Sequence, residues 1–316
     1  MRGLLTSRYL VAVLAAACFA VCAPLIPGMA TSGNLSNLVW NMLPLAVVTI
    51  GEVFVLIAGG IDLSVTAIIA LCSVTGALVM NGRTGYLAGN PAAAPVAVLF
   101  MLLVGALLGF LNGCAVTRLR MPAFIVTLTT MMFFGGFAVW LTRSANIDAL
   151  PPAFNGLAGF GTLTVAVVVA LAAHRTLRHS IFGRWLYATG MNARASLVSG
   201  VPVHAVTIAA YSVSGLLAAA ASVLYTARLE TGSPVLGQRI FLDVIAAAVI
   251  GGTSLFGGRG TVAGTLAGVL FVALLDNSLN LLGVSFFLVF TAKGVVILVA
   301  ALLDSAAQRV LGEAVE

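Results

Sequence analysis

Residues 56–65 read LIAGGIDLSV, and here a glycine pair and an aspartate interrupt one of the most apolar parts of the chain. Gly59 and Gly60 are expected to end one helix, because glycine tolerates the left-handed conformation that closes helices. If the break needs a positive φ angle, Gly60→Val is expected to be especially damaging. Asp62 or Ser64 can then accept hydrogen bonds from the exposed N–H groups of the next helix. The stretch predicts two apolar helices joined by a polar break. The alternative is that the break borders a conduit through a membrane.

The composition places these helices in a lipid bilayer. The 316 residues are 61% hydrophobic and 8% charged, and the mean hydropathy is +1.15. A soluble domain has about 25% charged residues. This chain therefore needs an apolar outer surface as well as an apolar core. We expect an all-α, polytopic membrane protein that forms a single transmembrane domain over residues 1–316.

Ten apolar runs follow one another, and most approach the ~20 residues with which a helix crosses the hydrocarbon core. They lie at 9–26, 40–58, 63–80, 95–116, 122–141, 159–173, 206–226, 241–251, 261–282 and 286–303. We expect a bundle of about ten transmembrane helices, although the short run 241–251 is also compatible with a re-entrant or broken helix. The first run exceeds the ~7–15 apolar residues of a signal peptide, so it is expected to be a retained span.

The arginines predict which helix ends face the cytoplasm. With ten crossings and the N-terminus inside, the cytoplasmic segments contain ten arginines and the outer segments four, as the positive-inside rule requires. The cytoplasmic ones are Arg2, Arg8, Arg118, Arg120, Arg175, Arg178, Arg184, Arg194, Arg259 and Arg309; the outer ones are Arg83, Arg143, Arg228 and Arg239. Both termini are therefore expected in the cytoplasm.

Several function classes are disfavoured by the motifs that the chain lacks. The net charge of +6 does not indicate nucleic-acid binding, because the arginines lie at the ends of apolar runs and do not cluster on one polar face. The single lysine, Lys293, is followed by Gly294 and Val295, so the chain has no Walker A loop for nucleotide hydrolysis. It has no HExxH or GxSxG motif, and its cysteines and histidines lack ligand spacing. We expect neither an enzyme nor a metal site.

Two runs carry glycines four residues apart: Gly105, Gly109, Gly113 and Gly260, Gly264, Gly268. This spacing puts small residues on one helix face, where another backbone can approach closely. Packing within this chain is favoured over contact with another subunit. The stretches 55–63 and 247–255 also resemble each other, since both end an apolar run with Gly-Gly-x-x-Leu.

One long polar segment, 174–205, separates the apolar runs, and its charged residues are all basic. It also contains Trp185, Leu197 and Val198, which is more apolar surface than a solvated loop needs. A short amphipathic helix at about 192–199 is predicted. It would dock against a cytoplasmic partner or lie on the lipid headgroups.

Four acids lie in apolar surroundings: Glu52, Asp62, Asp243 and Asp276. A charge at mid-membrane costs roughly 2.5–3.5 kcal/mol on insertion scales, so each acid is expected to face protein, water or a helix end. Their spacing indicates no carboxylate pair. For Glu52 a polar contact within the bundle is favoured, and the sequence leaves its protonation state open.

Several ordered motifs resemble the permease subunit of ribose-type ABC sugar importers. They are GGIDLSV, GRWLYATGMNARASLVSG (183–200) and LDVIAAAVIGGTSLFGGRGTVAGTLAGVL (242–270), with shorter matches at 111–113, 121–128, 279–284 and 293–304. The resemblance implies a dimer of permeases in the bacterial inner membrane, a separate ATPase that binds ATP and magnesium, and an extracytoplasmic sugar-binding protein. It implies no cofactor on this chain.

The resemblance also assigns the segment 174–205 to coupling with the ATPase. The matching positions are Gly183, Arg184, Tyr187, Gly190, Asn192, Ala193 and Gly200. The expected pathway or helix-break residues are Glu52, Gly59, Gly60, Asp62, Ser64, Asn112, Thr127, Thr129, Asn277 and Asn280. Their hydroxyl and amide groups suit a neutral monosaccharide, and no arginine lies at mid-span to hold a carboxylate or phosphate.

The chain departs from the family pattern at Glu52, Thr66, Thr129, Asp276 and Ser278, which leaves the identity of the sugar open. Related permeases for branched-chain amino acids or nucleosides are the nearest alternative. A different class, an ion-coupled secondary carrier, would use Glu52 or Asp62 as its proton site. Whether the second permease is identical is also left open.

Overall fold

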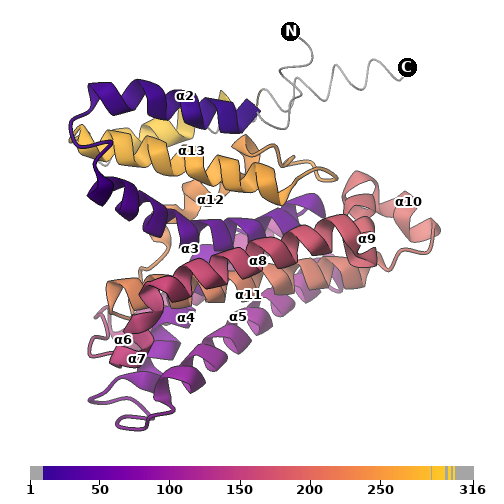
Figure 1. The fold of residues 1–316 in the computed structure, drawn as a ribbon. Coiled ribbons are helices and arrows are strands. Elements are labelled where there is room, and N and C mark those ends of the chain that lie inside the picture. Colours follow the sequence, from indigo (N-terminus) through magenta and orange to yellow (C-terminus); the bar gives the residue numbers. More distant parts are fainter. Residues whose placement is uncertain (1–9, 286, 296–297, 300–301, 303–316) are drawn as a thin grey trace.

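The structure is a computed structural model that describes residues 10–285, 287–295, 298–299 and 302, except for the side chain of Arg239. Within these residues the regular elements are all helices, apart from one isolated bridge between Ile147 and Gly232 (Figure 1). The all-α prediction is confirmed for this part of the chain. Arg2, Arg8, Arg309 and both termini lie outside the described residues.

The helices follow the predicted apolar runs. They are α2 (Leu10–Leu25), α3 (Ser32–Ile57), α4 (Val65–Met80), α5 (Ala93–Thr117), α6 (Ala123–Thr142), α7 (Pro152–Asn155), α8 (Phe160–His179), α9 (Ile181–Met191), α10 (Ala193–Val198), α11 (Val203–Leu229), α12 (Phe241–Ile250) and α13 (Val262–Leu281). Two short 3₁₀ helices, η1 (Gly156–Ala158) and η2 (Gln238–Ile240), lie between them, and residues 287–295 are helical.

Six of the described helices are long and apolar enough to cross a membrane: α3, α5, α6, α8, α11 and α13. The helices α2, α4 and α12 are apolar but shorter, and the last apolar run is described only in part. The chain is thus a polytopic bundle of membrane helices. The count of ten spans, the re-entrant course of 241–251 and the sides on which the termini lie remain predictions.

Large apolar side chains cover the outside of the bundle. Leu103, Phe133, Trp140 and Val168 are each exposed by more than half of their surface. In water such a surface would be strongly unfavourable, whereas in a bilayer it faces hydrocarbon. The apolar outer surface that the composition predicts is therefore confirmed.

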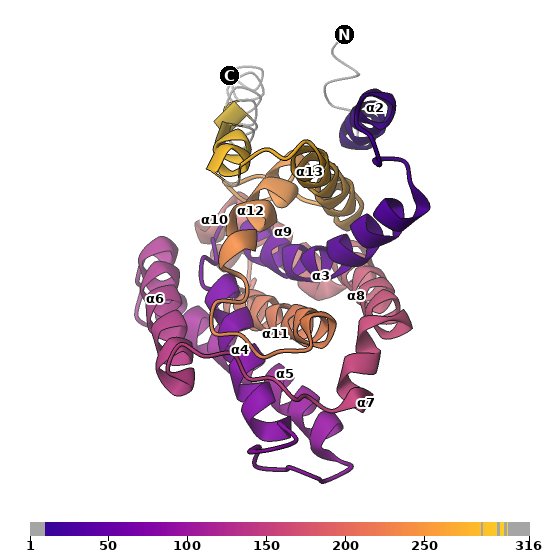
Figure 2. The ribbon, with the colours of Figure 1, turned by 90° about the vertical axis from the view of Figure 1, so that its left-hand side faces the viewer.

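Helices α3 and α11 lie side by side at the centre, and α5 packs along the other side of α11 (Figure 2). Helix α4 packs between α5, α6 and α11, while α6 stands at the edge of the bundle. The helices α2 and α13 pack on each other beyond α3, where Ala15, Met29 and Leu274 form a separate small core. This arrangement places the polar break after α3 against α11.

Both glycine ladders pack within the chain, as favoured. The ladder on α5 lies against α11, where a methyl group on Gly109 would overlap the carbonyl oxygen of Tyr211. In the second ladder, Gly264 and Gly268 lie on α13 against the end of α12, where a methyl group on Gly268 would overlap the carbonyl oxygen of Ala247. Gly260 lies in the loop before α13 instead, next to Ile57 and Thr253. Each ladder lets two helix backbones approach more closely than any larger residue would allow.

Candidate functional site

Helix α3 ends at the glycine pair in a Schellman motif. The N–H of Gly59 donates to the carbonyl of Leu56 at 2.9 Å, and the N–H of Gly60 donates to that of Val55 at 3.0 Å. The break does need a positive φ angle, and this angle of +82° is at Gly59, not at Gly60. Gly60 is needed for a different reason, because a β-carbon there would lie 2.7 Å from the hydroxyl oxygen of Tyr211.

Five buried polar side chains meet behind this break, and we call them the carboxyl cluster: Glu52, Asp62, Ser64, Asn112 and Ser214. Oδ1 of Asp62 accepts the N–H of Ser64 at 3.1 Å and its hydroxyl at 2.5 Å, and Oδ2 accepts the hydroxyl of Ser214 at 3.1 Å. The N–H of Asp62 donates to Oε1 of Glu52 at 3.0 Å. Nδ2 of Asn112 donates to Oγ of Ser64 at 2.7 Å. The polar contact expected for Glu52 is present.

Asp62 organises the chain just before α4. Of the two alternative caps, Asp62 or Ser64, the second is not realised, because the side chain of Ser64 makes no capping hydrogen bond to α4. Its N–H and O–H groups instead both donate to Asp62, in the i to i+2 turn that aspartate commonly forms. Asp62 therefore fixes the backbone that leads into α4.

The carbonyl oxygen of Ile61 joins two further helices to the break. The hydroxyl of Thr127 on α6 and that of Tyr211 on α11 each donate to it at 3.2 Å. Seven of the ten predicted pathway or helix-break residues are thus brought together: Glu52, Gly59, Gly60, Asp62, Ser64, Asn112 and Thr127. The sequence interpretation missed Tyr211 and Ser214, whose only signal is their i, i+3 spacing on one face of α11.

The two carboxyl groups of the cluster are held by neutral donors. Every hydrogen bond that described residues make to Glu52 or Asp62 comes from a backbone N–H or a hydroxyl group. Oε2 of Glu52 and Oδ1 of Asn112 are buried and have no hydrogen-bond partner among the described residues. Such an unpaired buried oxygen costs about 1–3 kcal/mol, so both atoms are strong candidate acceptors for a water molecule or another donor.

The other three predicted pathway residues lie away from the carboxyl cluster. Thr129 is exposed on α6, where its hydroxyl donates to a carbonyl of its own helix. Asn277 exchanges hydrogen bonds of 2.8 and 2.9 Å with Asn34 and so joins α13 to the start of α3. Asn280 is exposed and donates to the carbonyl of Asp276 at 2.8 Å.

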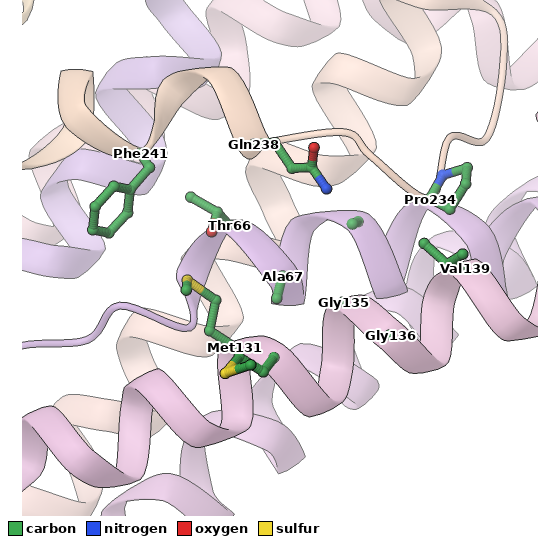
Figure 3. A pocket seen from close by; sticks show the side chains of 11 residues that line it. Thr66, Ala67, Met131, Gly135, Gly136, Val139, Pro234, Gln238 and Phe241 are labelled. Atoms are coloured by element: carbon green, nitrogen blue, oxygen red, sulfur yellow. The ribbon is translucent and has the colours of Figure 1, made fainter. Parts of the chain in front are cut away.

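A pocket of about 450 Å³ lies close to the break, and Thr66, two residues after Ser64, is one of its lining residues (Figure 3). Helices α4 and α6 and the segment 234–241 form its walls, and the lining residues include Thr66, Ala67, Met131, Gly135, Gly136, Val139, Pro234, Gln238 and Phe241. The volume lies within the roughly 300–1,000 Å³ of small-molecule sites. Its polar groups, the side chains of Thr66 and Gln238, are few against an apolar lining.

The predicted coupling residues lie on α9 and α10 or directly beside them, as Asn192 and Gly200 do, at one end of the bundle (Figure 1). The short helix expected at 192–199 is confirmed, since α10 spans Ala193–Val198. Asn192 caps it by accepting the N–H of Ala195 at 2.9 Å, and Gly200 ends it with a φ angle of +84°. Arg184, Asn192 and Ala193 are exposed.

Two residues of α9 tie this surface to the rest of the fold. Gly183 is buried at the start of α9 against α8, where a β-carbon would overlap the carbonyl oxygens of Thr176 and Leu177. The hydroxyl of Tyr187 donates to the carbonyl of Gly260 at 2.7 Å, and burial raises the pKa of this phenol. Helix α9 is therefore anchored on both α8 and the loop before α13.

A second set of buried and partly buried charged side chains links α12, α13 and the helical residues 287–295. Nζ of Lys293 lies 2.6 Å from Oδ1 of Asp243 on α12 and 2.8 Å from Oδ1 of Asp276 on α13. Lys293 and Asp243 are buried, and Asp276 is partly exposed. Sequence spacing gave no sign that these two acids share a partner. We call the three residues the lysine clasp.

Comparison with known proteins places the chain among membrane permeases. Residues 34–303 match the family described as "Branched-chain amino acid transport system / permease component". The chain is 36% identical over 315 residues to the ribose import permease protein RbsC of Escherichia coli, covering 96% of this chain and 95% of that protein. It is 39% identical over 281 residues to the protein of the same name from Bacillus subtilis, covering 86% and 84%.

A third relative has another cargo in its name. The autoinducer 2 import system permease protein LsrC of Yersinia pseudotuberculosis is 34% identical over 246 residues, which cover 75% of this chain and 67% of that protein. No solved structure matches the chain significantly.

Proposed function

This chain belongs to the family of branched-chain amino acid transport system permease components, and from that membership we propose that it carries a neutral monosaccharide as the permease subunit of an ATP-driven importer in a bacterial inner membrane. The permease role follows from the family. Identity of 36% along nearly the whole chain to a permease named for ribose import carries the proposal of a sugar cargo.

The polar groups beside the break favour such a cargo. The pocket offers Thr66 and Gln238, and the neighbouring carboxyl cluster holds two acceptor atoms, Oε2 of Glu52 and Oδ1 of Asn112, without partners among the described residues. Hydroxyl groups of a sugar can pair with the side chains of Thr66 and Gln238, whereas the two acceptor atoms of the cluster are buried in this conformation. A carboxylate or phosphate on the cargo would lack a cationic partner in this cluster, where every hydrogen bond that described residues make to Glu52 or Asp62 comes from a neutral donor.

The ATPase subunit is proposed to dock on α9 and α10. Met191, Leu197 and Val198 are exposed there by 72%, 57% and 90%, beside the exposed Arg184 and Arg194. A surface with basic residues around exposed apolar side chains suits a protein partner better than water. We further propose that this end faces the cytoplasm, that a binding protein delivers the sugar on the opposite side, and that two permeases pair.

Amino acids remain the second candidate cargo, because the family description names them. The ion-coupled carrier is not proposed, because residues 34–303 match a family described as a permease component of a transport system.

The cargo is tested through the importer's own binding protein, purified and screened against monosaccharides, nucleosides and branched-chain amino acids by isothermal titration calorimetry. We expect binding of a pentose or hexose, with ribose the first to be tried, and no binding of leucine. A binding protein that selects leucine-like amino acids over sugars would contradict the proposed cargo.

A further inference from the structure

Three segments that are far apart in the sequence meet backbone to backbone at the end of the bundle that carries α9 and α10. They are the end of α3 at Gly59, the last turn of α9 at Gly190, and the loop between α12 and α13 at Gly257 and Gly258. We call these four residues the glycine junction. The loop is the GGTSLFGGRG stretch, which had been singled out only as a motif.

The contacts of the junction leave no room for a β-carbon on Gly190 or Gly257. The N–H of Gly258 donates to the carbonyl of Ile57 at 2.9 Å. A β-carbon on Gly190 would overlap that same carbonyl oxygen and lie 2.5 Å from the nitrogen of Gly258. A β-carbon on Gly257 would lie 2.7 Å from the carbonyl oxygen of Gly190 and 2.9 Å from Cα of Gly59.

Direct backbone contact has a mechanical consequence. Flexible side chains between two helices can absorb a small displacement by changing rotamer, but here such a buffer is missing. A shift of α9 must therefore move the residues from Ile57 to Gly60 or the loop at Gly257. The bond from Tyr187 on α9 to Gly260, 2.7 Å long, adds a second connection to that loop.

The backbone segment that the junction contacts, at Gly59, continues directly into the carboxyl cluster. Gly60 is the next residue after the junction, Ile61 is held by Thr127 and Tyr211, and Asp62 follows. A displacement at Gly59 therefore reaches Asp62 within three residues along the chain.

We propose that the glycine junction transmits movement of α9 and α10 to the helix break and so positions Asp62 and the carboxyl cluster during each transport cycle. The inference rests on the proposed docking of the ATPase on α9 and α10. In this role Gly59, Gly190 and Gly257 are positioning residues that touch no cargo.

A matched pair of glycines separates transmission from backbone strain. Gly257 and Gly252 lie in the same loop and both have positive φ angles, +93° and +85°. A β-carbon at Gly252 meets nothing within 4 Å, whereas at Gly257 it meets Gly190 and Gly59. Gly252→Ala therefore introduces backbone strain alone. Gly257→Ala introduces similar backbone strain and also a methyl group that clashes with Gly190 and Gly59.

The experiment measures sugar taken up per ATP hydrolysed by the importer, reconstituted in liposomes with its ATPase and binding protein. The probe is radiolabelled ribose, or the monosaccharide that the binding protein retains in the screen above. We expect Gly257→Ala to hydrolyse ATP normally but to lower this ratio roughly ten-fold relative to Gly252→Ala. Tyr187→Phe should lower it about two-fold, and Tyr86→Phe, at an exposed tyrosine in the 81–92 loop, should not.

Equal ratios for Gly257→Ala and Gly252→Ala would overturn the inference. If Gly257→Ala does not reach the membrane, Tyr187→Phe decides, and a ratio equal to that of Tyr86→Phe overturns it. Failure of the proposed function would look different, because the unmodified protein would then take up no sugar with its ATPase and binding protein, or would take up sugar without the ATPase.

Discussion

Asp62 acts through the hydrogen bonds that its carboxylate accepts. Ser64 and Ser214 together direct three donors at it, and all three groups are buried. Asparagine keeps one oxygen for the two groups of Ser64, and the Ser214 hydroxyl can rotate to accept from the new amide. Alanine leaves every one of these donors unpaired, at about 1–3 kcal/mol each.

We therefore predict that Asp62→Asn retains most of the ATP-driven uptake, while Asp62→Ala loses membrane yield or activity. Both variants are compared by the amount of protein in purified membranes and by uptake in reconstituted liposomes. An Asp62→Asn protein that folds in normal yield but transports as poorly as Asp62→Ala would mean that the charge itself is needed.

The helix break also shows how much of the local structure single residue types predict from the sequence. The sequence pattern of GGIDLSV indicated a helix end and a role for Asp62, because glycine and aspartate have local preferences that do not depend on neighbours. It did not distinguish Gly59 from Gly60, since the first is fixed by its φ angle and the second by Tyr211, 151 residues further along the chain. Tertiary partners such as Ser214 were beyond the reach of local reasoning.

At the scale of helices, the lysine clasp links α12, α13 and the helical residues 287–295. Removing one member of a buried ion pair leaves an uncompensated charge, which costs about 3–5 kcal/mol. We predict that Lys293→Met strongly lowers the unfolding temperature of the purified protein in detergent. Asp276→Asn should change it little, because Asp276 is partly exposed and Lys293 keeps Asp243 as its partner.

The double variant Lys293→Met, Asp243→Asn serves as the control. It removes the lysine together with its buried partner, so it should recover much of the unfolding temperature that Lys293→Met alone has lost. If Lys293→Met unfolds at the same temperature as Asp276→Asn, the clasp does not stabilise these helices.

The positions of the helices were largely predictable, because lipid-facing and core-facing residues are both apolar and hydropathy marks each helix directly. The predicted short helix at 192–199 also appeared, as α10. Which faces of the helices pack against one another was less predictable. Asn277 was grouped with the pathway residues, yet it pairs with Asn34 instead, and Lys293 was noted only for its lack of a nucleotide motif.

For the whole molecule, fold and family agree on a membrane permease without a nucleotide-binding loop of its own. The bundle places the carboxyl cluster beside α11 and the surface of α9 and α10 at one end. An importer built in this way needs energy from another subunit. We therefore propose that this chain forms the path for the cargo and that a partner subunit hydrolyses ATP.

The most direct test reconstitutes this chain in liposomes with the binding protein and sugar outside and ATP inside, with and without the ATPase subunit. We predict accumulation of labelled sugar only when the ATPase and hydrolysable ATP are both present, with a non-hydrolysable analogue giving none. Undiminished accumulation by this chain without the ATPase would contradict the account.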